Sequence, residues 1–351
     1  MNIPIEVNTN KTDLNQISSE IQKNIDLAIQ KSPTGGNSKP FACNWKDNEI
    51  HITYSAQLAK HYLNRNDHTS YISLGCLIKS IEVAASKFEL LSIVNLSEDK
   101  LNARIKFQKQ NTSMHISNLF DSLMSRSTYR GKFKKSSNKN LRSQTVQHRQ
   151  AEISIDYQFN QSLTKKFKKY LTQSESYMWL QVCALKDFIS EIRFFSHLSS
   201  QQQRGISSYE LGISIVDQAL LFLLKPAPLV LSFIRRVPIL NFPMLQNSSR
   251  VLKNSNFCLF RTKELNPLSL IAVGEVAMQT WLEIESQGFK AQPMSLATIP
   301  IIDAKAGMLP DDTKEQFKKL YSESGIQVLN EQFSLRTDLK IVWMFRFGTA
   351  E

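Results

Sequence analysis

Two stretches of similar pattern decide the fold that we expect: GCLIKSIEVAASKFELLSI at residues 75–93 and GEVAMQTWLEIESQGFKAQ at residues 274–292. They align without a gap when Gly75 is placed over Gly274, an offset of 199 residues, and apolar positions then coincide along a helical face. Each stretch carries a glycine early in a helix and passes through a turn into an extended segment. Internal duplication is the sharper interpretation, and it predicts two α+β halves packed as an internal dimer with a cleft between them. Two unrelated amphipathic helices would share the same spacing, so that alternative stays open.

The rest of the chain supplies further elements to both halves. Helical periodicity predicts helices, whereas alternation and short apolar runs predict strands. The expected helices cover residues 13–31, 74–90, 116–124, 163–171, 177–195, 217–224 and 266–288, and the expected strands cover residues 48–54, 91–96, 103–107, 153–159, 257–262 and 339–348. In the last helix Asn266 is the expected N-cap, Pro267 lies in the first turn and Gly288 ends the helix. We therefore expect a first half at residues 1–120 and a second half at residues 121–351.

A Pro-punctuated apolar segment at about residues 225–243 interrupts the second half. Two interpretations fit it equally well. It is either a lid over a bound ligand or a piece of structural packing against the body of the protein.

The composition favours a soluble, folded chain. With 351 residues and 42% hydrophobic content, the chain can bury a large core. The N-terminal residues have no apolar signal core, and no segment supplies the roughly 20 uninterrupted apolar residues of a membrane-spanning helix. The cysteines lie far apart and without the spacing of a zinc site or a disulfide framework, which favours a cytoplasmic location. They are Cys43, Cys76, Cys183 and Cys258.

The formal charge of +12 suits a nucleic acid, an anionic membrane or a phosphate-bearing cofactor. Between Asp121 and Glu152 there are eight Lys or Arg residues and no acidic residue. A nucleic-acid-binding protein would use this run. However, aromatic residues do not interleave with it at stacking distance, and no helix-turn-helix or RRM pattern is present. We therefore expect neither a nucleic-acid partner nor a membrane partner.

Within that run, the segment SRSTYR provides Arg126, Ser127, Thr128 and Arg130 just beyond a predicted helix. Two guanidinium groups and two hydroxyls suit a phosphate group, since arginine binds phosphate oxygens through two parallel hydrogen bonds. Most charge runs are solvated surface loops, and the spacing alone favours that simpler interpretation.

Two further segments have the composition of ligand-binding turns. In KSPTGGNSKPF (residues 31–41) the glycines let backbone N–H groups approach a ligand closely, and Asn37 offers a donor and an acceptor on one side chain. In GFKAQPMSLATIP (residues 288–300) a helix stop is followed by extended backbone. A tight surface turn and a plain helix-to-strand connection are the alternatives. A P-loop is excluded because no GK[ST] follows the glycines.

In this order and spacing, the segments resemble those of the FMN-binding nitroreductase fold, and most of all its double-length form in dormancy-associated nitroreductase-like proteins of actinobacteria. PTGGNSKPF (residues 33–41) is similar to the PSxxNxQPW-type motif of the first half, and ISLGCLIKSIEVAASKF (residues 72–88) to the helix that follows it. Arg126 to Arg130 matches an RxxxR-type segment, and MFRFG (residues 344–348) is similar to the closing Arg-x-Gly strand. The resemblance covers roughly residues 17–348.

This resemblance implies a cytoplasmic FMN oxidoreductase that is a monomer with an internal pseudo-dimer. It would transfer two electrons, as hydride through flavin N5, from NAD(P)H or another donor to a quinone, nitro or peptide-derived substrate. It needs no catalytic side chain and no metal. Its FMN would be held by three segments and by Arg346. Arg126, Ser127, Thr128 and Arg130 would bind the phosphate and ribityl chain, Pro33, Thr34, Gly35 and Asn37 would reach in from the first half, Pro293, Met294 and Ser295 would face the ring with a backbone N–H near N5, and Arg346 would add a phosphate contact.

The chain also departs from the family pattern. Lys39 and Phe41 stand where Gln and Trp are usual, and Ser295 and Leu296 stand where Glu-Gly is common. FMN binding tolerates such changes more readily than turnover does. The alternative function is therefore a non-catalytic protein that sequesters flavin or has lost it.

Overall fold

The computed structural model describes residues 17–109, 114–135, 141–149, 151–196, 203–211, 215–225, 252–335 and 338–351. The helices are α1 (Ser19–Lys31), α2 (Ala56–Ala59), α3 (His68–Ser86), α4 (Met114–Ser117), α5 (Phe120–Ser125), α6 (Lys165–Leu180), α7 (Val182–Glu191), α8 (Ile215–Leu224), α11 (Pro267–Ser286), α12 (Ile299–Lys305), α13 (Glu315–Lys319) and α14 (Gly325–Phe333), with the short turns η1 (Gly35–Asn37), η2 (Asn160–Ser162), η3 (Ser295–Ala297) and η4 (Leu320–Ser324). The strands are β1 (Phe41–Lys46), β2 (Glu49–Tyr54), β3 (Leu90–Leu96), β4 (Ala103–Lys109), β5 (Phe133–Lys134), β6 (Gln144–His148), β7 (Ala151–Gln158), β8 (Ile192–Arg193), β9 (Ile206–Ser207), β10 (Asn256–Thr262), β11 (Lys290–Pro293) and β12 (Lys340–Ala350).

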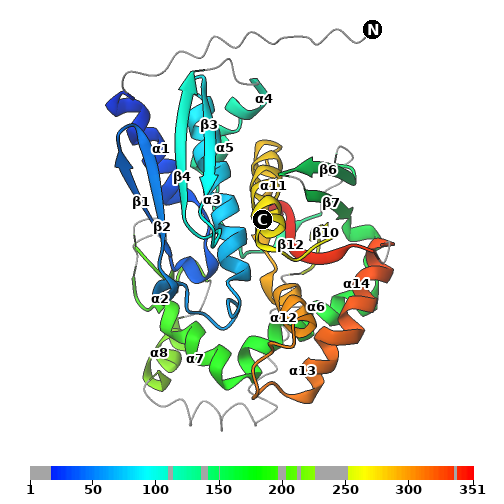
Figure 1. The fold of residues 1–351 in the computed structure, drawn as a ribbon. Coiled ribbons are helices and arrows are strands. Elements are labelled where there is room, and N and C mark those ends of the chain that lie inside the picture. The colour runs from blue at the N-terminus through cyan, green and yellow to red at the C-terminus, as the bar shows by residue number, and fades with distance from the viewer. Residues whose placement is uncertain are drawn as a thin grey trace, which may run out of the picture.

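Two antiparallel sheets flank a central pair of helices. The first sheet has the strand order β1-β2-β4-β3, and the second has the order β11-β12-β10-β7-β6. In Figure 1 the long helices α3 and α11 lie side by side between the two sheets. The expected α+β class is therefore confirmed. None of the helices in the described part of the chain combines the length and the apolar composition needed to cross a bilayer.

The two sequence halves share their hydrophobic cores. The core behind the first sheet includes Ile271, Met278 and Leu282 from α11. The core of the second sheet includes Ile72 from α3. Since these side chains are buried across the boundary, each half completes the core of the other. The α3–α11 pair therefore joins the two halves into one hydrophobic unit.

The crossing of α3 and α11 is close because both helices carry glycine at the contact. A Cβ atom built on Gly75 would lie 2.8 Å from the backbone N of Glu275 and 2.9 Å from Cα of Gly274, and it would overlap the carbonyl oxygen of Ile271. A Cβ atom built on Gly274 would in turn overlap the carbonyl oxygen of Ile72. The contact is thus reciprocal along the two helices.

Several sequence predictions differ from the structure in their boundaries. Helix α3 begins at His68 rather than near residue 74, because its first turns carry polar side chains that are nevertheless buried. The helix expected at 177–195 is divided at Gln181, whose φ of −103° and ψ of 130° are extended. The helix expected at 116–124 is likewise divided into α4 and α5, and β1 was not expected at all. Beyond Lys225, the proposed excursion at 225–243 lies outside the described residues.

Candidate ligand-binding site

A cavity of about 680 Å³ lies where the first-half loops, the central helices and the second sheet meet. This volume is within the range of about 300–1,000 Å³ typical of small-molecule sites. Every residue that the sequence suggested as a cofactor contact lines this cavity. These residues are Pro33, Thr34, Gly35, Asn37, Arg126, Ser127, Thr128, Arg130, Pro293, Met294, Ser295 and Arg346. The fold therefore brings together segments that are far apart in the sequence.

The segment 126–130 runs along the edge of the second sheet. Tyr129 N–H donates to Ala291 O at 3.0 Å, and Thr128 forms a parallel bridge with Ala291. Arg346, on the neighbouring strand β12, donates through Nη2 to Gly131 O at 3.1 Å and Tyr129 O at 3.4 Å. These contacts fix the backbone of the segment, so the side chains that line the cavity start from a rigid edge.

Among the expected phosphate and ribityl contacts in segment 126–130, Arg126 is the most deeply buried, with 6% of its surface exposed. Its guanidinium lies 4.2 Å from the centre of the Trp281 ring, and Nη2 donates to Lys31 O at the end of α1. Its Nε–H is buried and has no acceptor among the described residues. Burial lowers the pKa of Arg126 to about 10, so the group stays charged near neutrality. A buried cation with an unused donor is suited to an anionic ligand.

Arg130 lines the same cavity and is less buried than Arg126. It is half-buried, and Nη1 is 3.5 Å from the backbone oxygen of Glu210. Burial lowers the pKa of Arg130, whereas the nearby Glu210 charge raises it. Together with Arg126 and the hydroxyls of Ser127 and Thr128, it gives this end of the cavity a positive, donor-rich wall.

Arg346 is fully buried, and its guanidinium is already used within the protein. Besides the two backbone oxygens of segment 129–131, its Nε donates to Gln292 Oε1 at 2.6 Å, and the group lies 4.9 Å from the Phe133 ring centre. Burial lowers the pKa of Arg346 to about 10. In this structure Arg346 therefore positions the arginine segment, while a phosphate contact from it stays a prediction.

The turn at residues 33–37 closes the cavity from the first half. Gly36 has a φ of 57° and Asn37 a φ of 53°, a conformation that glycine and asparagine adopt most readily. The Asn37 amide nitrogen donates to Gln203 O at 2.8 Å and to Gly205 O at 2.9 Å. Asn37 thus fastens the turn to the loop before β9, and a ligand contact through this nitrogen would require these bonds to open.

The third expected segment offers few backbone donors. Met294 N–H donates to Met344 O at 2.8 Å, and Pro293 has no N–H. Ser295 begins the turn η3, where the first N–H groups have no partner within the turn. Of these three residues, Ser295 is therefore the one placed to offer a backbone N–H to a ligand.

The cavity also contains acidic residues and a histidine that the sequence did not single out. His61 Nε2 lies 2.9 Å from Glu191 Oε1, and Leu63 N–H donates to His61 Nδ1 at 2.9 Å. Since Nδ1 accepts, Nε2 carries the proton, and both ring nitrogens are engaged. The Glu191 carboxylate also packs against Gly36, where a Cβ would come within 2.6 Å of Oε1. No local pattern links positions 61 and 191, so only the tertiary structure reveals this pair.

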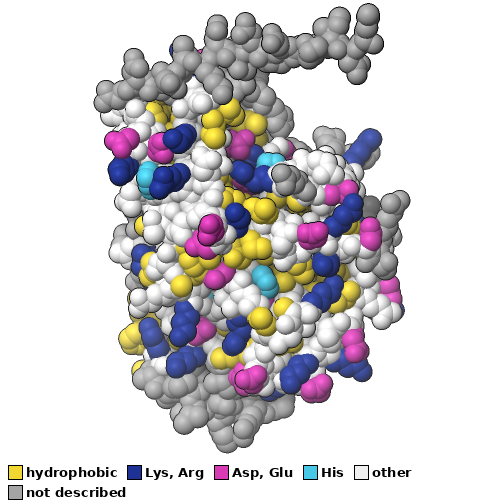
Figure 2. All heavy atoms as spheres, viewed as in Figure 1, with side chains coloured by type: hydrophobic (Ala, Val, Ile, Leu, Met, Phe, Trp, Pro, Cys, Tyr) yellow, Lys and Arg dark blue, Asp and Glu magenta, His cyan; other side chains and the backbone are white. Residues whose placement is uncertain are grey.

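The surface seen in Figure 2 carries Lys and Arg side chains mixed with Asp and Glu side chains rather than one continuous basic patch. The first two arginines of the basic run, Arg126 and Arg130, line the internal cavity. This arrangement gives no support to a nucleic-acid groove on that face.

The chain matches no known protein-family model and has no detectable similarity to any curated protein. The geometry of the cavity is therefore the main basis for a functional proposal.

Proposed function

We propose that the chain is an FMN-dependent oxidoreductase of the nitroreductase class that moves two electrons between a reduced nicotinamide and a quinone, nitro or peptide-derived substrate. One observation carries the proposal. All the residues that the resemblance assigned to FMN, from four separate regions of the sequence, line one cavity of suitable size.

The chemistry of the cavity agrees with a flavin mononucleotide. Its phosphate would lie against the Arg126 Nε–H, which lacks an acceptor among the described residues, and within reach of Ser127, Thr128 and Arg130. The buried Trp281 and the wall of β12 would exclude water from the ring. A bound FMN would supply hydride transfer at its ring, which none of the protein's side chains can provide. The Ser295 N–H would orient the ring, and the arginines would offset negative charge.

The topology supports the duplicated architecture within this proposal. In the first half, strand order β1-β2-β4-β3 has α3 leading into the outer strand β3. In the second half, the order β7-β10-β12-β11 has α11 leading into the outer strand β11. The reciprocal contacts of Gly75 with Ile271 and of Gly274 with Ile72 obey the same offset of 199 residues. This is the relationship expected of an internal two-fold axis.

Anaerobic addition of NADH or NADPH to the flavin-loaded protein tests the proposal. Loss of the flavin absorption band, and its return when a quinone is added, is the expected result. A flavin that is bound but not reduced by either nicotinamide would favour the sequestering protein instead. The engaged donors of Asn37 and Met294 are the observations that favour that alternative.

A further inference from the structure

Charged groups of both signs line the cavity. The cations are Lys31, Arg126, Arg130 and Arg346. The carboxylates are Glu175, Glu191 and Glu210, which all come from the segment that runs from α6 to the loop after β9. Arg130 lies beside Glu210, and the charge of Arg346 acts on Glu175, so cations and carboxylates are interspersed.

Two of these three carboxylates have partners in the protein. Glu191 pairs with His61 at 2.9 Å, and Glu210 Oε2 accepts from Ser207 N–H at 3.3 Å. Glu175, on α6, is half-buried and has neither a hydrogen bond nor an ion pair with any described residue. A carboxyl group used only for structure would be expected to have donors around it. Glu175 is therefore available to a molecule inside the cavity.

The charged and titratable groups described around Glu175 form neither a hydrogen bond nor an ion pair with its carboxyl group. Arg346 is the nearest cation, but its donors hold Gln292 and the backbone of residues 129–131. Burial raises the pKa of Glu175 to about 7, and the Arg346 charge only partly opposes this. Tyr62 and Tyr321 are the neighbouring phenols, and burial raises the pKa of both well above the usual value, so they stay neutral.

Apolar side chains also line the cavity. Met178 lies one turn further along α6 from Glu175, and Phe188 on α7 and Leu221 on α8 contribute to the cavity lining. Tyr62 lines the cavity and is close enough to interact with the charge of Glu175. An apolar lining with one unpaired carboxyl group fits an apolar body that ends in a positive group.

We propose that the cavity binds an apolar, aromatic molecule bearing a protonated amine, and that Glu175 anchors the amine. This inference rests on the proposed function in one respect, since the amine would be the substrate or an inhibitor lying beside the flavin. A cation beside Glu175 offsets the cost of burying the carboxylate, whereas an anion beside it adds a second negative charge.

Calorimetric titration with tryptamine tests the proposal, with indole-3-propionate as the control that keeps the ring and reverses the charge. We expect tryptamine to bind and the carboxylate analogue to bind at least about tenfold more weakly. At about pH 7, binding should release roughly half a proton per amine, because the half-protonated Glu175 becomes ionised. Titrations in two buffers with different ionisation enthalpies measure that release.

The variant Glu175→Gln should lose at least about tenfold in tryptamine affinity and should release no proton. Glu315→Gln, which changes an exposed carboxyl on α13, is the matched control and should behave as the unmodified chain. Unchanged binding in Glu175→Gln, or equal binding of the two indoles, would overturn the proposal. Flavin content is read separately from absorbance, and the titrations are made on the protein with and without added FMN. A failure of FMN binding is therefore distinguishable from a failure of amine binding.

Discussion

Gly75 of α3 and Gly274 of α11 lie against one another, and each glycine faces a backbone carbonyl of the opposite helix. A Cβ on Gly75 would be 2.9 Å from Cα of Gly274, which is closer than side-chain atoms pack. The joining of the two halves therefore depends on two positions that lack side chains.

Alanine at either glycine should destabilise the protein by about 1–3 kcal/mol. The added Cβ meets backbone atoms that cannot rotate away, and this overpacking exceeds the gain of about 1 kcal/mol that alanine brings to a helix. Thermal or denaturant unfolding of Gly75→Ala and Gly274→Ala measures the effect. Gly35→Ala is a suitable control, because its Cβ would meet only Thr69 Oγ1 at 3.9 Å. Equal stability of all three variants would show that the helices are not in close contact.

Some elements of the second half were predictable from local sequence signals. Asn266 caps α11 by accepting Ser269 N–H at 2.9 Å, and Pro267 occupies the first turn, as expected. Strands β10 and β12 appear as buried apolar runs, because both faces of their sheet are covered. Patterns of this kind can be predicted because they depend on residues that are close together in the sequence.

The start of α3 was harder to predict, because tertiary contacts rather than local patterns stabilise it. Its first turns contain Thr69, Ser70 and Ser73, which carry no apolar periodicity, yet all three are buried, and Thr69 and Ser73 line the cavity. A polar helix start of this kind is stabilised by tertiary contacts. Thr69 Oγ1, for example, donates to Asn64 Oδ1 at 2.6 Å.

In the candidate site, the resemblance selected segments whose side chains do line one cavity. The resemblance did not reveal which groups of the protein these side chains already contact. The hydrogen bond from Asn37 to Gly205 and the stacking of Arg126 on Trp281 are contacts between distant positions, and Glu175 has no partner among the described residues. Such contacts leave no trace in residue spacing, so they could be found only in the folded chain.

Replacement of Arg126 should weaken FMN binding more than replacement of any exposed arginine. Removal of a charged hydrogen bond costs about 1.5–3 kcal/mol, so we expect roughly a 10- to 100-fold loss of affinity in Arg126→Met. Arg126→Lys should recover little, because lysine lacks the planar fork of guanidinium. Fluorescence titration with FMN gives the affinities, and Arg104→Met on the exposed face of β4 is the control. If Arg126→Met bound FMN as tightly as the control, the phosphate assignment would be wrong.

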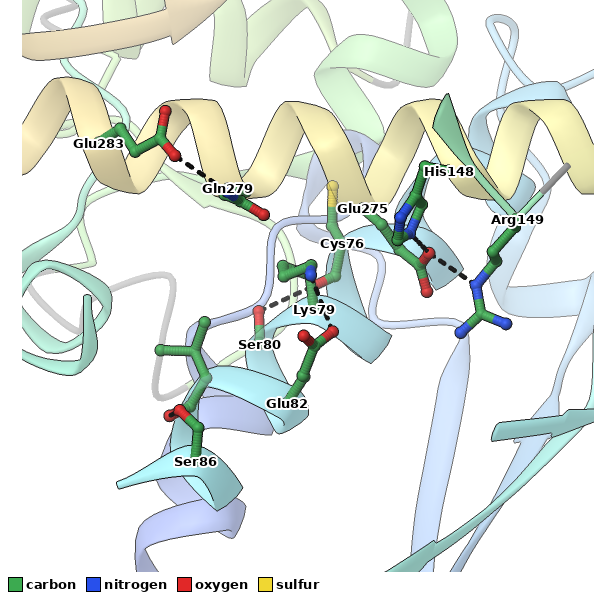
Figure 3. A network of polar contacts seen from close by, with 11 residues as sticks. Cys76, Lys79, Ser80, Glu82, Ser86, His148, Arg149, Glu275, Gln279 and Glu283 are labelled. Carbon is green, nitrogen blue, oxygen red and sulfur yellow. Dashed lines mark hydrogen bonds and ion pairs between the residues drawn. The ribbon is translucent and has the colours of Figure 1, made fainter. Parts of the chain in front are cut away.

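The polar network beside the helix crossing should make stability depend on pH. Figure 3 shows Glu275 of α11 between His148 and Arg149, and its side chain is completely buried. Burial raises the pKa of Glu275, but the hydrogen bonds and charges of His148 and Arg149 outweigh this and hold the pKa below its usual 4.5. The carboxylate therefore stabilises the fold fully above that value, and this contribution is lost as the pH falls through the lowered pKa.

Glu275→Gln should accordingly cost about 2 kcal/mol near neutral pH and show a shallower loss of stability as the pH falls below 4.5. Denaturant unfolding across this range measures both effects. The exposed Glu315→Gln variant provides the reference curve. Parallel curves for Glu275→Gln and the unmodified chain would mean that the network does not hold an ionised Glu275.

The same network bears on how many ligands each chain holds. With the offset of 199 residues, Cys76, which lines the cavity, corresponds to Glu275, and Trp281 corresponds to Glu82. Glu275 is buried in its ion pairs, and Glu82 pairs with the buried Lys79 at 2.8 Å. Under the proposed duplication, side chains thus fill the place that corresponds to the cavity, and we expect one flavin per chain.

The absorption spectrum of the purified protein, after incubation with FMN and removal of the excess, tests the central claim most directly. The flavin released on denaturation, divided by the protein concentration, gives the number of sites. We predict a yellow protein with about one FMN per chain. A colourless protein that takes up no FMN would contradict the account.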